Sequence, residues 1–384
     1  MAEDKKFLPM SDPRNRHFRV VFNYTPGTTP QQGPVILQTD QADNLPAFDF
    51  SGSAIRLLPD APATRLFDVG QCIYCGATKY DPLSDAPLSE EHVVPEALGA
   101  RLILGRASCK DCQERITIFE GNILGSLLRP ARRQLNMRGK KRRRGVEEYP
   151  IYVFEESTST SGEYVKMSLA DHPSIMMLPV MEPPGLYHNP PKSTSNIVSA
   201  FCMVLNDYSK ALSKGFRSFS PCVLDTVYFC QFLAKICHGL AVAAYGLDGF
   251  VPLLTEYIRA DFRTELWTDR HRFIGGDPRK LASTRDVLHI AEPILSVFPD
   301  RSDKRSYLLM RLRLFASYGA PLYDVVVGYF TPEQIAKVQV LDTTLLYTPD
   351  KTLAPSPLDG ATARPLPSGP TDPSSRGDAA PTGL

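Results

Sequence analysis

Two closely spaced cysteine pairs constrain this chain more than any other feature of its sequence. Cys72 and Cys75 form the first pair, and Cys109 and Cys112 form the second. Each pair places two thiols where a tight turn can direct both toward one ion, and four thiolates suit tetrahedral Zn²⁺ at about 2.3 Å per bond. The segment between the pairs is longer than in compact zinc ribbons, but a longer loop costs only logarithmically more entropy to close. We therefore predict one four-cysteine zinc site with an inserted functional segment.

The other cysteines lie in apolar sequence, where free cysteine is usually a small core residue. They are Cys202, Cys222, Cys230 and Cys237. Tight pairs favour metal binding in a reducing compartment, and residues 1–6 lack the apolar run of a signal peptide. The longest apolar stretch, 226–247, is interrupted by Gln231, Lys235 and His238, so we expect a buried core helix instead of a membrane span. These features predict a cytoplasmic protein with no membrane partner.

The segment between the cysteine pairs contains a histidine that follows a carboxylate. It reads Ser89-Glu90-Glu91-His92-Val93-Val94-Pro95, in which the valines favour a short strand and the proline ends it. Neutral imidazole titrates near physiological pH, so a histidine beside a metal-binding carboxylate can act as a general base. An isolated Glu-His pair is usually structural or merely exposed. Its position between the two cysteine pairs favours a functional site here.

Taken in order, these residues resemble the zinc-containing branch of the HNH endonucleases. The resemblance rests on the first cysteine pair, the run Glu91-His92-Val93-Val94-Pro95 with Leu98 and Gly99, the second pair, and Glu120. These residues span roughly a fifth of the chain, and their order is specific. The resemblance implies a ββα-metal unit, in which the histidine ends the first strand of a hairpin and a helix follows the second cysteine pair.

The same resemblance implies roles for individual residues. His92 would be the general base that activates water, and Glu91 would help to hold a catalytic divalent cation, Mg²⁺ or Mn²⁺, against the scissile phosphate. The zinc would be structural, because a four-cysteine site is closed to substrate. Gln113 stands where many relatives have Asn or His, and its longer side chain shifts the reach of that amide. Glu120 is expected to be a further ligand of the catalytic cation or a carboxylate that orients the helix.

Positive charge gathers directly after this segment, although the net charge of the whole chain is only +1. A basic run neutralises phosphates and releases counterions, whereas an isolated run is more often a solvated loop. Its place beside the nuclease-like residues favours contact with nucleic acid, and DNA is the expected substrate. The basic residues are Arg129, Arg132, Arg133, Arg138, Lys140, Lys141, Arg142, Arg143 and Arg144.

The remaining sequence predicts an α+β fold around this unit. We expect a loop-rich segment with a short strand over 1–69, the zinc-stapled HNH unit over 70–145, a mixed α+β domain over 146–347 and a disordered tail over 348–384. Proline, serine and glycine dominate that tail. Proline-rich sequence near 182–191 indicates a connection and a candidate domain boundary.

Within the larger domain, spacing predicts particular elements. Strand-like sequence covers 149–153 and 164–169, and the pattern is interpreted as helical from 197 to 259. In the best part of that pattern Asp225 can cap the start of a helix and Gly246 can close its end. Strand-like runs at 307–315 and 324–327, separated by Gly319-Ala320-Pro321, predict a hairpin.

Three functions fit these observations. The first is a metal-dependent endonuclease that hydrolyses phosphodiester bonds with His92 as the base. The second is a binding module of the same fold without catalysis, which the departure at Gln113 permits. The third is a structural zinc clip, which predicts no salt-dependent affinity for nucleic acid, whereas the other two predict that affinity falls steeply with salt.

Overall fold

The structure is a computed structural model, and its side-chain detail is confined to part of the chain. It describes residues 63–99, 102–137, 148–154, 163–188, 191–193, 197–206, 218–220, 224–261, 272–279, 283, 287–297 and 305–338, together with the backbone of short strands at 15–16, 20–21, 35–36 and 55–57. Helices and strands both contribute to the described chain, which confirms the predicted α+β class.

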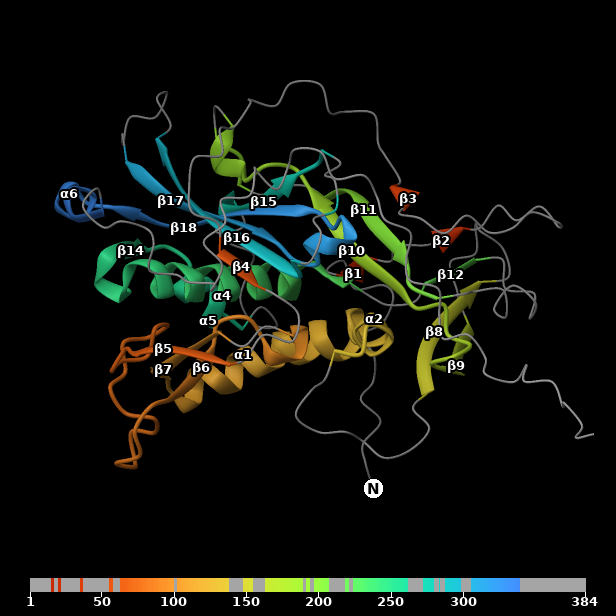
Figure 1. The fold of residues 1–384 in the computed structure, drawn as a ribbon, viewed down its shortest axis with the longest axis horizontal. Coiled ribbons are helices and arrows are strands. Elements are labelled where there is room, and N and C mark those ends of the chain that lie inside the picture. Colours follow the sequence, from red (N-terminus) through yellow and green to blue (C-terminus); the bar gives the residue numbers. More distant parts are fainter. Residues whose placement is uncertain are drawn as a thin grey trace, which may run out of the picture.

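A six-stranded antiparallel sheet occupies the centre of the described chain (Figure 1). Its strands are β14 (Val251–Pro252), β18 (Leu322–Phe330), β17 (Ser306–Arg313), β16 (His289–Val297) and β4 (Ile55–Leu57), with β15 (Ile274–Asp277) also paired to β18. The predicted hairpin is confirmed, since β17 pairs antiparallel with β18 across a turn in which Gly319 has a φ of 75°. Nearly all side chains of this hairpin are buried, so both of its faces are covered.

One long helix, α4 (Thr226–Tyr245), lies between this sheet and the orange segments of Figure 1. Its start is fixed by Asp225, whose carboxylate accepts from the backbone N–H groups of Val227 and Tyr228, and its end by Gly246 at a φ of 75°. Both caps were predicted. The helix is long and apolar enough to cross a membrane, but 89% of its apolar window is buried in the folded chain. The prediction of a buried core helix is therefore confirmed.

Smaller sheets extend from this centre. One contains β2 (Val20–Val21), β12 (Ser218–Ser220), β8 (Glu148–Phe154) and β9 (Glu163–Ser168); another contains β10 (Ile175–Met181), β11 (Ile197–Val204) and β3 (Val35–Ile36); and β1 (Asn15–Arg16) pairs with β13 (Leu224–Asp225). Strands β8 and β9 confirm the strand predictions at 149–153 and 164–169. Short helices complete the described chain: η3 (Gly185–Tyr187), η4 (Leu247–Gly249), α5 (Thr255–Arg259), η6 (Ala316–Tyr318) and α6 (Pro332–Val338).

One element prediction in this region is wrong. The start of the stretch interpreted as helical, 197–204, is strand β11, which pairs along its length with the fully buried β10. Ile197, Val198 and Val204 are β-branched and suit the pleated surface that β10 offers, and that pairing outweighs the weak helical spacing. The helical interpretation holds for 226–245 (α4) and 255–259 (α5), whereas 218–220, 224–225 and 251–252 are the short strands β12, β13 and β14.

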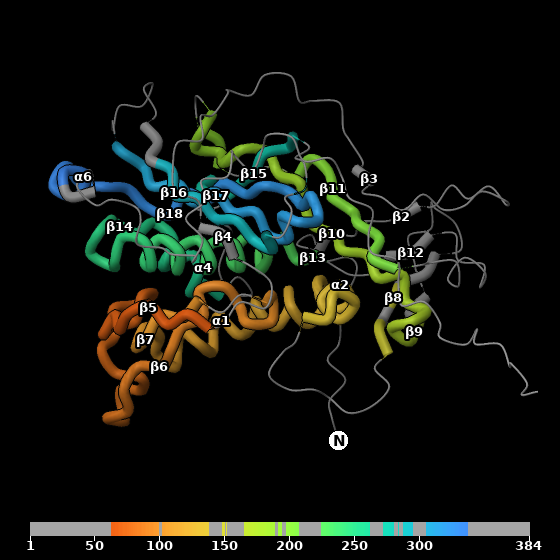
Figure 2. Tube along the Cα trace, viewed as in Figure 1, coloured from red at the N-terminus to blue at the C-terminus, as the bar shows by residue number. Residues whose placement is uncertain are grey.

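The two cysteine pairs belong to a small group of elements within residues 64–134, which we call the cysteine unit. It contains a three-stranded sheet in the order β5 (Thr64–Asp68), β7 (Leu102–Ser108) and β6 (Ser89–His92), in which β5 is parallel and β6 antiparallel to β7. The turn η1 (Glu96–Leu98) joins β6 to β7, and α1 (Lys110–Asn122), η2 (Ile123–Leu127) and α2 (Arg129–Gln134) follow. Figure 2 shows the cysteine unit in orange, lying against the side of α4 away from the sheet.

The predicted division into domains stays a prediction. Buried apolar side chains from Cys72 to Phe330 form one contiguous cluster that includes both the cysteine unit and the sheet. The short strand predicted within 1–69 falls at residues 17–22, of which the structure describes only β2. The predicted disordered tail at 348–384 falls outside the described residues, as does Cys222. Cys202, Cys230 and Cys237 are buried free thiols, as expected.

Candidate functional site

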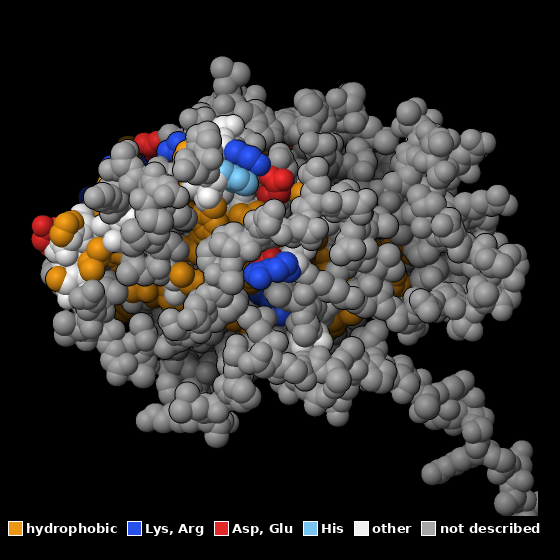
Figure 3. Space-filling model, turned by 90° about the horizontal axis from the view of Figure 1, so that it is seen from above, with side chains coloured by type: hydrophobic (Ala, Val, Ile, Leu, Met, Phe, Trp, Pro, Cys, Tyr) orange, Lys and Arg blue, Asp and Glu red, His pale blue; other side chains and the backbone are white. Residues whose placement is uncertain are grey.

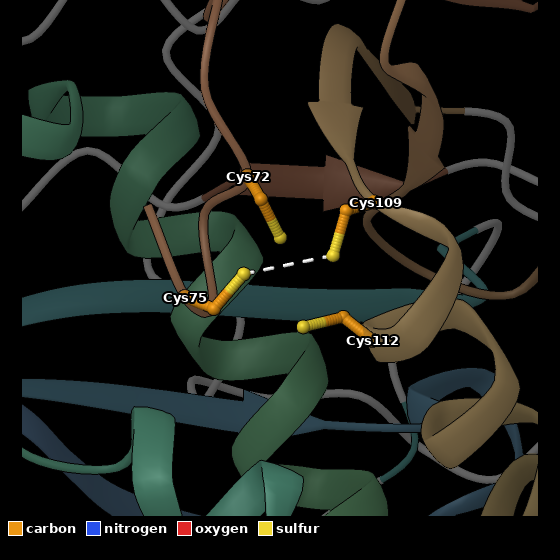
Figure 4. A group of neighbouring side chains, drawn as sticks. All are labelled: Cys72, Cys75, Cys109 and Cys112. Atoms are coloured by element: carbon orange, nitrogen blue, oxygen red, sulfur yellow. Dashed lines mark hydrogen bonds between the residues drawn. The ribbon is translucent and has the colours of Figure 1, made fainter. Parts of the chain in front are cut away.

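The four paired cysteines converge at one end of the cysteine unit (Figure 4). Cys72 and Cys75 come from a tight turn in which the backbone N–H of Gly76 donates to the carbonyl of Cys72, and Gly76 has a φ of 77°. Cys109 directly precedes α1, and Cys112 lies in its first turn. The turn and the helix start therefore each direct two thiols toward the same point.

The spacing of these thiols suits a metal ion. All four sulfur atoms lie within 4.8 Å of one another, and the Sγ atoms of Cys75 and Cys109 are 3.5 Å apart. Tetrahedral Zn²⁺ with bonds of about 2.3 Å would hold its sulfur ligands about 3.8 Å apart. The predicted cluster is thus confirmed as a group that could hold a metal ion such as zinc.

Thiol ionisation points the same way. The pKa of Cys72 is lowered to about 5, chiefly because the Cys112 thiol hydrogen-bonds to it, and the same contact raises the pKa of Cys112. Burial raises the pKa of Cys75 to about 11. Four packed thiols therefore do not ionise together by themselves. A divalent cation at their centre supplies the positive charge that four thiolates need.

The histidine and the carboxylate predicted for catalysis lie at the end of β6. His92 is the last residue of this strand, β6 and β7 form an antiparallel hairpin, and α1 follows through the second cysteine pair. Successive side chains of a strand point to opposite faces. Accordingly Glu91 is buried against the rest of the chain, whereas His92 is half-buried on the other face.

The buried Glu91 meets Glu120 of α1 and a residue that the sequence analysis had not assigned to the site. Lys235 of α4 forms ion pairs with both carboxylates, at 2.8 Å to Glu91 and 3.0 Å to Glu120. Burial opposes the charge on Lys235, but the attraction of Glu120 and Glu91 outweighs it and raises the pKa of the ammonium group. Burial also raises the pKa of Glu120. Because an ammonium group already lies between the two carboxylates and pairs with both, the arrangement does not fit the divalent cation that the resemblance implies.

Gln113, where relatives have Asn or His, serves a different connection. Its amide nitrogen donates to the hydroxyl of Ser89, and its amide oxygen accepts from the hydroxyl of Tyr80 at 3.2 Å. Ser89 in turn donates to the carbonyl of Ser108 at 2.9 Å. The amide therefore ties α1 to the start of β6, at the opposite end of this strand from His92.

Side chains from outside the hairpin hold the segment that follows His92. Lys235 donates to the carbonyls of His92 and Val93, and His289 of β16 bonds to the carbonyl of Leu98 at 2.9 Å. Arg132 of α2 donates to the carbonyl of Ala97 at 2.6 Å. Residues 92–98 are thus fixed by charged and imidazole side chains from distant elements.

The face of α4 toward the cysteine unit carries a polar stripe. Gln231, Lys235 and His238 are spaced at i, i+4 and i+7, which places them on one side of a helix. Gln231 donates to the carbonyls of Tyr257 and Ala260, and His238 bonds to the carbonyl of Ile73 at 2.8 Å. This spacing was the sequence signal that could have identified Lys235. His238 is buried, which confirms its interpretation as a core histidine.

The basic residues predicted to bind nucleic acid do not share one environment. The Arg129 guanidinium lies 5.0 Å from the centre of the Tyr149 ring, and burial lowers the pKa of Arg132 to about 10 while its side chain bonds to the carbonyls of Ala97 and Leu124. Arg133 is half-buried. Arg138 and the run 140–144 lie beyond the described part of the chain. On the face drawn in Figure 3, the described basic and acidic side chains lie in small mixed groups.

Comparisons with known proteins add no assignment. No family model, no curated protein and no solved structure matches this chain.

Proposed function

We propose that the cysteine unit is an HNH-type module that acts on nucleic acid, and that it hydrolyses phosphodiester bonds with His92 as the general base. The observation that carries the proposal is the order of parts around His92. It ends the first strand of a hairpin that leads directly into a helix through a four-cysteine cluster. That is the arrangement which the sequence resemblance implies, and His92 is only half-buried.

The hydrolytic step follows from the chemistry of imidazole. Neutral His92 takes a proton from a water molecule, the water oxygen attacks the phosphorus, and the bond to the leaving alkoxide breaks as that oxygen acquires a proton from solvent. The four cysteines would hold a structural zinc, which fixes the start of α1 against the hairpin and takes no part in the step. In this proposal the Glu91–Glu120 pair, whose carboxylates are both bonded to Lys235, holds no divalent cation for the step.

Nucleic acid is the proposed partner because a run of positively charged residues follows this unit in sequence and can bind phosphates. The run from Lys140 to Arg144 follows α2 closely in sequence, and it supplies the phosphate contacts in this proposal. DNA is the proposed substrate. Arg132 is excluded from that surface, since its guanidinium already bonds to two backbone carbonyls.

A second function is favoured by a specific observation. Lys235 forms ion pairs with both acidic residues, and the Gln113 amide is bonded to Tyr80 and Ser89. Two expected catalytic groups, Glu91 and Gln113, therefore make structural contacts. A zinc-organised module that binds nucleic acid without cleaving it would keep the hairpin, the cysteine cluster and the basic run. It differs from the first function only in the step at His92.

The experiment that separates these functions is cleavage of supercoiled plasmid by the full chain and by His92→Ala at matched zinc content. Mg²⁺ and, separately, Mn²⁺ are added, because either cation can enter on the substrate phosphates. Nicking by the unmodified chain alone supports hydrolysis through His92, and equal nicking by both proteins contradicts it. If neither protein cleaves DNA or RNA, salt-dependent binding of the same plasmid supports the binding module, and no binding contradicts both functions.

A further inference from the structure

The most unusual charged group in the described chain is the ammonium of Lys235. Its side chain is 2% exposed, and it lies on a helix whose residues 229–243 are all buried. Gly239, one turn further along the same face, brings α4 against the cysteine unit. A Cβ at Gly239 would lie 3.2 Å from Val93 Cγ1, so a larger residue would push the helix away. This close approach delivers the Lys235 side chain to the end of β6.

Oxygen atoms surround the Lys235 ammonium. Two belong to the carboxylates of Glu91 and Glu120, at 2.8 and 3.0 Å, and two to the carbonyls of His92 and Val93, the latter at 3.4 Å. An ammonium group has three hydrogens to donate, so these acceptors saturate it. Carboxylate and carbonyl oxygens are also the ligands that hard divalent cations prefer. The environment of Lys235 is therefore a cation site whose cation is part of the chain.

A divalent cation and the ammonium cannot share this space. The Nζ–O distances here are close to 3 Å, whereas Mg²⁺ requires oxygen ligands at about 2.1 Å, so the metal could bind only where Nζ now lies. Displacing Lys235 would leave its charge buried among apolar residues, and Ile236 and Cys237 beside it are 0% exposed. Leaving such a charge without a partner strongly destabilises the folded state.

We propose that the ammonium group of Lys235 is the resident cation of the Glu91–Glu120 pair, and that it excludes divalent metal from this position in the intact chain. The inference rests on the proposed function in so far as it concerns the carboxylates next to His92. It makes the positive charge at this site permanent and independent of the metal supply. It also assigns Lys235 a positioning role, because the same group holds the carbonyl of His92.

The test is a titration of the zinc-loaded full chain with Mn²⁺. Electron paramagnetic resonance measures the concentration of free Mn²⁺, from which the affinity is obtained. Four proteins are compared: the unmodified chain, Glu120→Gln, Lys235→Met and the double variant Lys235→Met/Glu120→Gln. The unmodified chain and Glu120→Gln are expected to bind Mn²⁺ equally weakly. Lys235→Met, which keeps the length of the side chain and removes its charge, is expected to bind at least roughly tenfold more tightly, and the double variant to lose this gain.

Two results would overturn the inference. One is Mn²⁺ binding by the unmodified chain that Glu120→Gln weakens about tenfold or more, which would show that the metal already occupies the pair. The other is a folded Lys235→Met protein with no gain in affinity. Should Lys235→Met fail to fold, the comparison of the unmodified chain with Glu120→Gln still decides. Asp85→Asn, which changes a carboxylate that is 98% exposed, serves as the control for surface binding.

This outcome is independent of cleavage. If the unmodified chain binds Mn²⁺ through Glu120 and also cleaves DNA, the divalent cation lies on Glu91 and Glu120 and the role of His92 stays intact. If the Mn²⁺ affinities are as expected but the protein cleaves no nucleic acid, the proposed hydrolysis is contradicted and Lys235 remains the resident cation.

Discussion

The cysteine unit and the sheet with α4 are held together in different ways. Of the thirteen residues of α1 only Cys112, Ile116 and Phe119 are buried, and β5 is largely exposed. In contrast, residues 229–243 of α4 and nearly all of the β17–β18 hairpin are buried. Both regions share one contiguous apolar cluster, but the sheet and α4 contribute almost wholly buried elements to it. The cysteine unit has a largely exposed helix and edge strand, and a metal ion at its four cysteines would add to what holds it together. This difference predicts which changes unfold or destabilise each region.

Removal of the metal should have the largest effect, and it should be confined to one region. Binding of a structural zinc contributes on the order of 10 kcal/mol to the folding of small zinc domains. Chelation should therefore expose the amides of 72–122 to hydrogen exchange while those of 307–330 stay protected. Simultaneous loss of protection in both regions would show that the two do not differ in this way.

Loss of a buried ion pair in the sheet should destabilise the sheet and leave the cysteine unit with its metal. Arg311 and Asp324 face each other on β17 and β18 at 2.8 Å, with side chains 2% and 3% exposed. Arg311→Met leaves a buried carboxylate without its partner, which should lower the free energy of unfolding by about 3–5 kcal/mol. Chemical denaturation measures this change, and Lys79→Met, at an exposed pair, should change it by less than about 1 kcal/mol. The zinc content of Arg311→Met should equal that of the unmodified chain. A lower zinc content would contradict the proposed difference between the sheet and the cysteine unit.

Acid should weaken the contact between the two regions. Burial lowers the pKa of His238 and of His289 to about 4, and each imidazole bonds to a carbonyl of the cysteine unit. An unfolded histidine titrates near pH 6.5, so between about pH 6.5 and 4 the unfolded chain binds more protons and stability falls as the pH falls. Each histidine accounts for up to about 3 kcal/mol. Denaturation as a function of pH should show this slope, and His289→Gln should reduce it by about half; an unchanged slope would exclude His289 as its source.

The smallest effect is expected at a helix end. Asp225 accepts from two backbone N–H groups at 3.0 Å each at the start of α4. Asp225→Ala should therefore lower the free energy of unfolding by about 1 kcal/mol. Asp225→Asn, which keeps an acceptor oxygen, should recover most of that loss in the same denaturation experiment, and a loss equal to that of alanine would show that charge rather than capping matters.

Local signals explain which parts of the fold could be predicted. The cysteine pairs, the caps of α4 and the β17–β18 hairpin depend on residues near one another in sequence, and these predictions were confirmed. Strand β11 was interpreted as helical because its conformation depends on pairing with β10. The spacing of residues within β11 gives no sign of that partner. Propensity is weak where a neighbouring strand decides the outcome.

The site was harder to predict than the fold for the same reason. Glu91, His92 and Glu120 could be picked out by their order along the chain, but their main partner, Lys235, lies 143 residues beyond His92. A lysine in an apolar helix indicates a buried partner without identifying it. Only the packing of α4 against β6 and α1 shows that this partner is the pair of carboxylates that had been assigned to a metal.

In the proposed function, the four cysteines hold a zinc ion that organises the hairpin and the helix around His92. X-ray absorption at the zinc edge of the purified chain tests it directly. One zinc per chain, bound by four sulfur atoms at about 2.3 Å, is the predicted result, and the four-sulfur coordination should be lost in Cys112→Ser. Absence of zinc, or a first coordination sphere of nitrogen and oxygen, would contradict the claim.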